Sequence, residues 1–265
     1  LVPLTKSGKE FWDVNVNGSR ITAEVALEKR VKSFIHMSSS AIYGSVDKFP
    51  ITVETERNPV EIYGRSKLAG ENQVEKILNG KIPLAVVRPR TILGEGRLGI
   101  FQILFEWIDE NRNVYCLGSG NEKFQFVHAS DLINAYMLIS NQGKSGFYNI
   151  GASDFGTLRE ALENLIKSVG SFSKVKSIPA YPSILTLRTL DFLRLSPLAP
   201  WHYLTYHKPF HFDVSPLQDL GWKATYSNDK MLRESFEWFL RNKHNGRYDK
   251  LSPHRSRVKE SFLKI

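Results

Sequence analysis

The sequence has little cysteine and no long apolar run, and both shortages narrow the classes of protein to consider. Its 265 residues include one cysteine, Cys116, which excludes an internal disulfide and gives secretion no support. Cys116 stands in an apolar segment, so we expect it to be buried. No stretch reaches the roughly 20 apolar residues of a membrane span, and no signal peptide is visible. We therefore expect a cytoplasmic protein.

The histidines do not have the spacing of a metal site. Of the seven histidines, only His202, His207 and His211 gather, and they do so loosely within an aromatic segment. Structural zinc sites have closer and more regular ligand spacing, so we predict no metal. His128 is expected to be a structural residue of a strand. The chain also has no internal repeat and no low-complexity tract.

The net charge of +9 is concentrated at one end of the chain. Residues 241–265 contain eight lysines and arginines but only two acidic residues, so they carry +6 of that charge. A terminal cluster of this kind is usually solvated and mobile, although contact with a membrane surface or RNA stays open. The residues before 241 are nearly balanced in charge, which is typical of a metabolic enzyme and does not favour nucleic-acid binding.

Alternating strand and helix patterns up to about residue 150 predict an α/β fold. Residues 33–37 and 83–88 are apolar segments that resemble buried strands. Between them we expect a helix that starts with an Asn-Pro-x-Glu pattern at Asn58 and ends at Asn79-Gly80. A strand, a helix and a strand of these lengths indicate a parallel crossover, and ligands of such sheets bind outside the carboxyl ends of the strands.

Tyr63 and Lys67 are four residues apart on this predicted helix, so their side chains share one face. Turning a phenol of pKa about 10 into a base near pH 7 takes roughly 4 kcal/mol of selective stabilisation of the phenolate. One positive charge at about 4 Å in an effective dielectric of about 20 supplies about that much. A packed tyrosine beside a solvated lysine is the plain alternative. However, Ser38, Ser39 and Ser40 at the end of the preceding strand favour proton-transfer chemistry.

Several short motifs follow one another in an order that a known family shares. They are 15–19 (Asn-Val-Asn-Gly-Ser), 38–44 (Ser-Ser-Ser-Ala-Ile-Tyr-Gly), 63–67 (Tyr-Gly-Arg-Ser-Lys), 88–89 (Arg-Pro), 126–131 (Phe-Val-His-Ala-Ser-Asp) and 220–223 (Leu-Gly-Trp-Lys). With these motifs the sequence resembles the NAD-dependent epimerase/dehydratase family, the extended branch of the short-chain dehydrogenases/reductases. The resemblance extends from about residue 1 to 240. The segment 15–19 resembles a motif at which a helix of the family starts.

The resemblance implies a role for each site residue. Tyr63 would be the general acid or base, Lys67 would lower its pKa and bind the nicotinamide ribose, and Ser39 would polarise the substrate oxygen, with Ser40 as the fallback. NAD or NADP would be the cofactor, and a hydride would move to or from a hydroxyl-bearing carbon of a small molecule. Further expected site residues are Ser38, Pro89 and Arg90 toward the cofactor, and Ser40, Thr91, Arg97 and Phe124 toward the substrate.

With this resemblance, we predict an incomplete Rossmann-type, doubly wound parallel sheet with a smaller carboxyl-terminal substrate lobe. The partial dinucleotide-binding domain would span 1–150, with 89–115 contributing to the substrate cleft; 151–240 would be mainly the substrate lobe, and 241–265 a basic tail. A strand at 124–128 and a helix at 131–141 are expected to return to the sheet. We also expect a strand at 113–117 and helices at 100–108, 157–169, 184–194 and 229–242.

The family's amino-terminal Gly-x-x-Gly-x-x-Gly turn, where a helix holds the dinucleotide pyrophosphate, has no counterpart before Leu1. Leu1–Thr5 resembles the segment after the fourth strand, so roughly the first third of the cofactor domain is expected to be missing. We expect this polypeptide alone to bind the cofactor poorly or not at all. The segment 94–99 has a G-x-G-x-x-G spacing, but no acidic residue closes the next strand, so we interpret it as a loop bordering the substrate cleft.

The substrate class stays open at this stage. Thr91 and Phe124 stand where sugar-nucleotide enzymes of the family place Asn and Arg to hold a diphosphate, and phenylalanine cannot bind phosphate. The sequence leaves a sugar-nucleotide epimerase or dehydratase, a hydroxysteroid- or flavonol-type dehydrogenase or reductase, and a non-catalytic cofactor-sensing scaffold. The apolar helix at 184–194 would be a packed lobe helix, a lid or a peripheral membrane contact. The resemblance also implies a homodimer.

Overall fold

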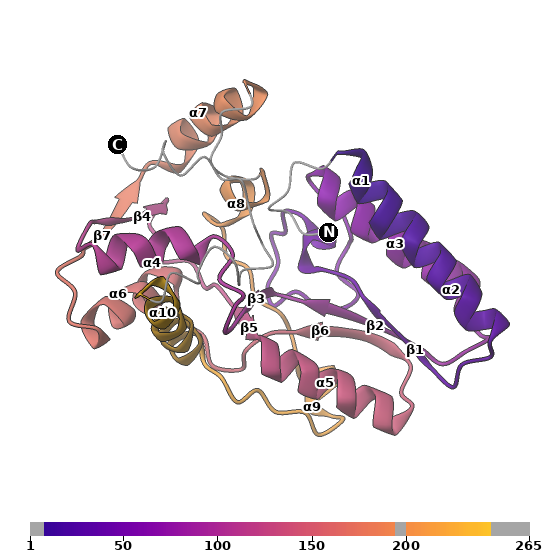
Figure 1. The fold of residues 1–265 in the computed structure, drawn as a ribbon. Helices are drawn as coiled ribbons and strands as arrows, with labels where there is room; N and C mark the ends of the chain where they lie inside the picture. Colours follow the sequence, from indigo (N-terminus) through magenta and orange to yellow (C-terminus); the bar gives the residue numbers. More distant parts are fainter. Residues whose placement is uncertain (1–7, 194–199, 245–265) are drawn as a thin grey trace.

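Three parallel strands form the central sheet of the computed structural model, which describes residues 8–193 and 200–244 (Figure 1). They are β1 (Phe34–Met37), β2 (Leu84–Pro89) and β6 (Gly146–Ile150), in the order β1-β2-β6. The register places Phe34 opposite Leu84, and both pairings are parallel. The parallel crossover from β1 to β2 is confirmed, and with it the α/β fold class.

Helices cover both faces of this sheet (Figure 1). On one side lie α1 (Lys9–Trp12), a π-helical turn (Asp13–Gly18), α2 (Ser19–Glu28) and α3 (Ile62–Leu78), and on the other side lies α5 (Ala129–Gln142). The helix start predicted at 15–19 is wrong, because these residues lie in the middle of a continuous helical run. The run is held there by contact with α3, where Asn15 Nδ2 donates to Ser66 Oγ at 3.0 Å.

The helix α3 begins later than predicted. Glu61 and not Asn58 is its N-cap, because the Glu61 carboxylate accepts hydrogen bonds from the backbone N–H groups of Tyr63 and Gly64, both at 2.6 Å. A carboxylate has two oxygens for two donors, whereas an asparagine side chain has one. Asn58 lies instead in a parallel bridge with the segment that follows β1. The helix ends at Asn79-Gly80, as predicted.

A second group of elements forms the lobe on the left of Figure 1. It contains two short parallel pairs, β3 (Thr91–Leu93) with β5 (Phe126–His128), and β4 (Val114–Leu117) with β7 (Val175–Ile178). Its helices are α4 (Phe101–Asp109), α6 (Leu158–Ser168), α7 (Ala180–Phe192), α8 (Pro200–Thr205) and α10 (Asn228–His244). The short helix α9 (Ser215–Gln218) lies instead near α5 and contacts β6 of the central sheet (Figure 1). The strand predicted at 124–128 exists but does not return to the central sheet. It pairs with β3, because the backbone N–H and C=O groups of both short strands need hydrogen-bond partners. The strand that joins the central sheet beside β2 is β6.

One apolar core joins the central sheet to this lobe. The inner face of α4 contributes Phe105, which packs against Phe236 and Phe239 of α10 with ring centroids 5.4 and 6.0 Å apart. Cys116 lies in the same core, as expected, and burial raises the pKa of its thiol to about 11. His128 is buried at the end of β5, where its ring caps α5, so its predicted structural role in a strand is confirmed.

The helix α7 has no buried residue, and Tyr181, Leu185 and Phe192 are exposed on it. This arrangement does not fit a packed core helix. In the part of the chain that the structure describes, no helix is both long and apolar enough to cross a membrane, and no cluster of His, Cys, Asp or Glu could hold a metal ion. Of the predicted basic tail, only 241–244 are described, as the last turn of α10; 245–265 and Leu1–Thr5 lie outside the described residues.

Candidate active site

The serine segment leaves the carboxyl end of β1 and rests directly on α3. Ser39 has an extended backbone and caps a 3-10 turn at Ser40–Tyr43, with its Oγ accepting the backbone N–H of Ala41 at 3.2 Å. Below this turn lies Gly64 of α3, whose hypothetical Cβ would lie only 2.6 Å from the Ala41 carbonyl oxygen. Gly64 therefore lets the serine segment come close to the helix backbone, which a residue with a Cβ would prevent.

Tyr63 lies in the first turn of α3 and has 8% of its surface exposed. Burial raises the pKa of its phenol to about 12, because a phenolate loses its hydration there. Hydrogen bonding with Ser39 opposes this shift, as does the positive charge of Arg97, whereas the charge of Glu61 adds to it. The structure therefore brings Ser39, Tyr63 and Arg97 together beside the carboxyl end of β1.

Lys67 follows one turn later, but its ammonium group bonds to the strand and not to the phenol. Its Nζ donates to the carbonyl oxygen of Met37, the last residue of β1, at 2.6 Å. Burial lowers the pKa of Lys67 to about 8, and the negative charge of Glu71 opposes this lowering. In this arrangement the cation that lowers the pKa of Tyr63 is Arg97, so the pairing of phenol and ammonium expected from their spacing is not formed here.

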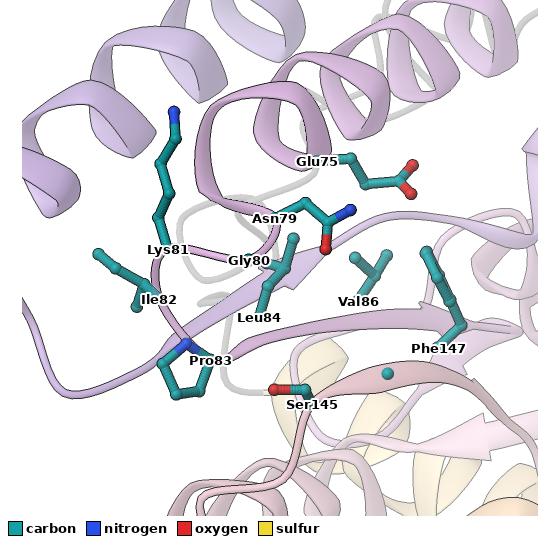
Figure 2. Close-up of a pocket in the computed structure, with 11 residues that line it drawn as sticks. Glu75, Asn79, Gly80, Lys81, Ile82, Pro83, Leu84, Val86, Ser145 and Phe147 are labelled. Atoms are coloured by element: carbon teal, nitrogen blue, oxygen red, sulfur yellow. The ribbon is translucent and has the colours of Figure 1, made fainter.

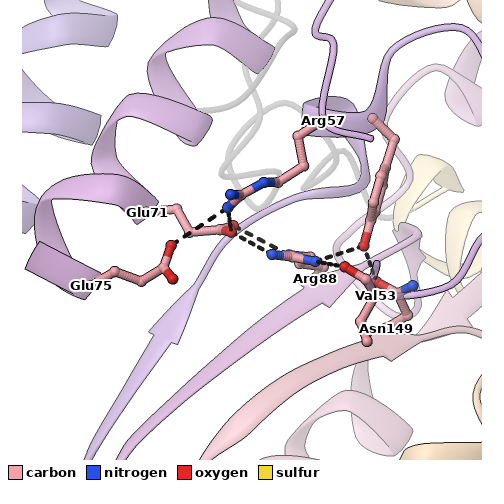
Figure 3. Close-up of polar contacts among 7 residues, drawn as sticks. Val53, Arg57, Glu71, Glu75, Arg88 and Asn149 are labelled. Atoms are coloured by element: carbon pink, nitrogen blue, oxygen red, sulfur yellow. Dashed lines mark hydrogen bonds and ion pairs between the residues drawn. The ribbon is translucent and has the colours of Figure 1, made fainter. Parts of the chain in front are cut away.

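A buried ionic network anchors α3 to the central sheet (Figure 3). Glu71, which is fully buried, binds Arg88 of β2 through both carboxylate oxygens and also accepts a hydrogen bond from Arg57 at 2.9 Å. Arg88 Nη1 donates in addition to the hydroxyl of Tyr43 at 2.8 Å. Burial alone would raise the pKa of Glu71, but hydrogen bonds and positive charge from Arg88 outweigh it and hold this pKa below its usual value. Glu71 is thus a permanent anion four residues after Lys67.

Arg90 points into the protein interior beside the serine segment. Its Nε donates to the carbonyl oxygen of Gln125 at 3.0 Å, and its Nη1 donates to Ser40 Oγ at 3.2 Å. The guanidinium lies over the rings of Phe124 and Phe210, with Cζ at 4.8 and 4.1 Å from their centroids. Arg90, which was expected toward the cofactor, therefore forms one buried cluster with Ser40 and Phe124, which were expected toward the substrate. Burial lowers the pKa of Arg90 to about 9.

Thr91 and Arg97 border the same region from the lobe side. Thr91 begins β3 and hydrogen-bonds with the side chain of Tyr206. Arg97 lies in the glycine-rich loop between β3 and α4, where Gly96 has a φ of 72°. Burial lowers the pKa of Arg97 and the Tyr63 phenol opposes this, so the loop faces the tyrosine. The Nε atom of Arg97 is buried and has no hydrogen-bond partner among the described residues.

A pocket of about 520 Å³ lies at the opposite end of β2 (Figure 2). It is lined by the end of α3, by the turn at 80–83, by Leu84 and Val86 of β2 and by the start of β6. None of the predicted site residues lines this pocket. Ligands of parallel sheets bind at the carboxyl ends of the strands, and Leu84 is the amino end of β2, so we do not assign the reaction to this pocket.

Comparison with known proteins identifies the group to which these features belong. A model of the NAD dependent epimerase/dehydratase family matches residues 5–151. The chain belongs to this family. It is 41% identical over 266 residues to the uncharacterized protein y4nG of Sinorhizobium fredii, which covers 100% of the chain and 67% of that relative. It is also 26% identical over 244 residues to dTDP-D-glucose 4,6-dehydratase of Homo sapiens, which covers 89% of the chain and 64% of the relative.

A solved structure shows the same fold. UDP-glucuronic acid 4-epimerase from Bacillus cereus, in complex with NAD, superimposes with a TM-score of 0.69 at 19% identity, over 86% of this chain and 67% of that one. The chain thus spans about two thirds of the length of the epimerases and dehydratases that it matches.

Sequence reasoning missed part of the site of this epimerase/dehydratase chain. Arg88 was noticed only as part of an Arg-Pro motif, and its partner Glu71 was not noticed at all. A signal was present, because Glu71 follows Lys67 by four residues and so lies on the same helix face. Tyr206 and Phe210, from a segment more than a hundred residues after β2, had no signal in sequence spacing.

Proposed function

We propose that the protein containing this chain binds NAD or NADP and moves a hydride to or from a hydroxyl-bearing carbon of a sugar nucleotide, with Tyr63 donating or accepting the proton. The observation that carries this proposal is the position of the Ser39 turn at the carboxyl end of β1, directly on Gly64 and so next to Tyr63, in a chain of the epimerase/dehydratase family. The cofactor would exchange the hydride, and the residues of this chain would move the proton.

The nicotinamide-ribose end of such a cofactor fits the residues that surround Lys67. An ammonium group has three N–H donors, and the Met37 carbonyl takes one of them. The other two can reach ribose hydroxyls at the edge of the sheet. Pro89, which ends β2 opposite Ile150, would lie along the nicotinamide ring, and the buried Ser38 would support the strand end.

The state of Tyr63 suits it to donate a proton to a developing oxyanion, because its raised pKa keeps it neutral. For the reverse step, the phenolate has to be stabilised by positive charge, which Arg97 and the nearby Lys67 can supply. Ser39 Oγ accepts the Ala41 N–H, and its single proton is directed toward Tyr63 in this structure. This proton would turn to the substrate oxygen when a substrate binds.

The carboxylates of Glu61, beside Tyr63, and of Glu71, beside Lys67, favour epimerisation or reduction over loss of water. An elimination needs a general acid for the leaving hydroxyl and a general base for the proton on the neighbouring carbon. Glu61 is engaged by two backbone N–H groups, and Glu71 is engaged by Arg57 and Arg88. Both carboxylates are therefore committed to structure, which leaves Tyr63 as the group that moves protons.

The test uses the chain extended with the upstream segment of y4nG. The extended protein is incubated with UDP- and dTDP-hexoses and NAD or NADP, and NMR follows epimer formation while absorbance follows the reduced cofactor. The substitution Tyr63→Phe should lower kcat by roughly 10²- to 10⁴-fold and leave cofactor affinity unchanged. The matched control is Tyr115→Phe, on an exposed tyrosine of β4, which should behave as the unsubstituted enzyme. Undiminished turnover in Tyr63→Phe would remove the proposed role.

A further inference from the structure

A buried arginine, Arg90, bonds to Ser40, the residue that follows Ser39 in the chain. Arg90 has 2% of its surface exposed, and within the described ranges no ion pair joins it to a carboxylate. Its stabilising neighbours are the aromatic rings of Phe124 and Phe210. The attraction of a desolvated cation to aromatic rings is weaker than the cost of removing the charge from water. Arg90 is therefore not a residue that stability alone would select at this position.

The hydrogen bonds of Arg90 lead to the same conclusion. Nε and Nη1 are used by the Gln125 carbonyl and by Ser40 Oγ, but Nη2 is buried and has no hydrogen-bond partner in the described part of the chain. Buried polar groups without partners are rare, and each asks for an explanation. If the guanidinium served only to connect segments of the fold, its Nη2 atom would be expected to have a hydrogen-bond partner as well.

The bond from Arg90 decides what the Ser40 hydroxyl can do. Because Ser40 Oγ accepts a hydrogen bond from a charged donor, its own proton is free to be donated elsewhere. A hydroxyl that accepts such a bond is polarised and becomes a stronger donor. Ser40 directly follows Ser39, and both belong to the turn that rests on Gly64 beside Tyr63.

We propose that Arg90 is a positioning residue that holds the 38–43 segment against the lobe and orients the Ser40 hydroxyl as a hydrogen-bond donor to the substrate. The group that Ser40 would bind is an oxygen that gains negative charge during hydride transfer, such as a carbonyl or alkoxide oxygen. This proposal rests on the hydride transfer proposed above. It assigns to Arg90 an action on the substrate through Ser40, in place of direct contact with the cofactor.

The experiment compares Arg90→Met, Ser40→Ala and the double variant in the extended enzyme, with Arg112→Met as the control on an exposed arginine. Methionine removes the unpaired charge but keeps apolar contact with the two rings, so the melting temperature should stay equal or rise. By contrast, kcat should fall roughly 10- to 100-fold, as expected for a misplacement of up to about 1 Å, while cofactor affinity should not change. The double variant should be no slower than the slower single variant, because both substitutions disrupt one interaction.

Two results would overturn the proposal: an unchanged kcat in Arg90→Met, or effects of the two substitutions that multiply. If Arg90→Met does not fold, Arg90→Lys is measured in its place, because an ammonium group cannot reach both Gln125 and Ser40. An unchanged kcat in Arg90→Lys would then overturn the proposal. An inactive unsubstituted enzyme would count against the proposed function instead. The contact is then judged by NMR, where the Arg90 guanidinium signal should shift on Ser40→Ala, and a signal that stays in place contradicts the inference.

Discussion

Replacing Gly64 with alanine tests whether the contact between α3 and the serine segment sets the catalytic geometry. Alanine in place of a helical glycine normally stabilises a protein by about 1 kcal/mol. Here the added Cβ would lie 2.6 Å from the Ala41 carbonyl oxygen, and ordinary contacts begin at 3.4 Å. The serine segment would have to move by about 0.8 Å, the difference of these two distances. Since overpacking costs about 1–3 kcal/mol, we expect the free energy of unfolding to fall by up to about 2 kcal/mol.

The same displacement moves Ser39 away from Tyr63. A misplacement of about 1 Å can lower a rate by about 10²-fold, so kcat of Gly64→Ala should fall roughly 10- to 100-fold. The matched control is Gly18→Ala, because a Cβ on Gly18 would meet its nearest atom, the Asp13 carbonyl oxygen, at 3.8 Å.

Urea unfolding and steady-state kinetics on both variants decide the question. Gly18→Ala should gain up to about 1 kcal/mol and keep its turnover, whereas Gly64→Ala should lose both stability and turnover. If Gly64→Ala were as stable as Gly18→Ala and as active as the unsubstituted enzyme, the serine segment would not depend on this contact, and the reasoning would be wrong.

Two further predictions concern the charged groups of α3. Arg88→Met leaves the buried Glu71 with Arg57 as its one ion-pair partner among the described residues. Unfolding in urea should therefore show a loss of about 3–5 kcal/mol, partly restored by adding Glu71→Gln. A loss below about 1 kcal/mol would contradict the anchoring role. Lys67 has a pKa of about 8 when folded and 10.5 ordinarily, so the unfolded chain binds more protons between these pH values, and this residue makes stability rise with pH there. The stability difference between the unsubstituted protein and Lys67→Met should therefore grow from pH 8 to 10.5, and a flat difference would refute the lowered pKa.

Features governed by local rules could be predicted from the sequence. The capping box at Thr157 and Glu160 fixes the start of α6, and both of its hydrogen bonds are present. The crossover around Tyr63 also follows from residue types within one segment. The sequence places the start of α3 three residues too early, because Asn58 is a residue type that commonly caps helices, whereas glutamate is not. In the fold, the Glu61 carboxylate nevertheless accepts the first N–H groups of the helix.

What could not be predicted depends on pairing between distant segments. The sequence does not show that β5 pairs with β3 instead of the central sheet, because a strand of three residues has too little pattern to specify its neighbour. It also does not show that Phe210 covers Arg90, 120 residues away in the chain, as the numbering of the two residues shows. The partner of Lys67 depends likewise on the backbone position of Met37, which spacing along α3 cannot reveal.

Arg88 of β2 and Arg90, the residue directly after this strand, explain how one segment controls the distance between the reacting hydroxyls. Arg88 holds α3 through Glu71 and holds the far end of the serine segment through the Tyr43 hydroxyl. Arg90 holds the near end of the same segment through Ser40. Tyr63 and Ser39 therefore sit on two elements that are both attached to β2 by charged hydrogen bonds, which are stronger than neutral ones. A substitution at either arginine should then change the separation of the Tyr63 and Ser39 hydroxyls without touching either residue.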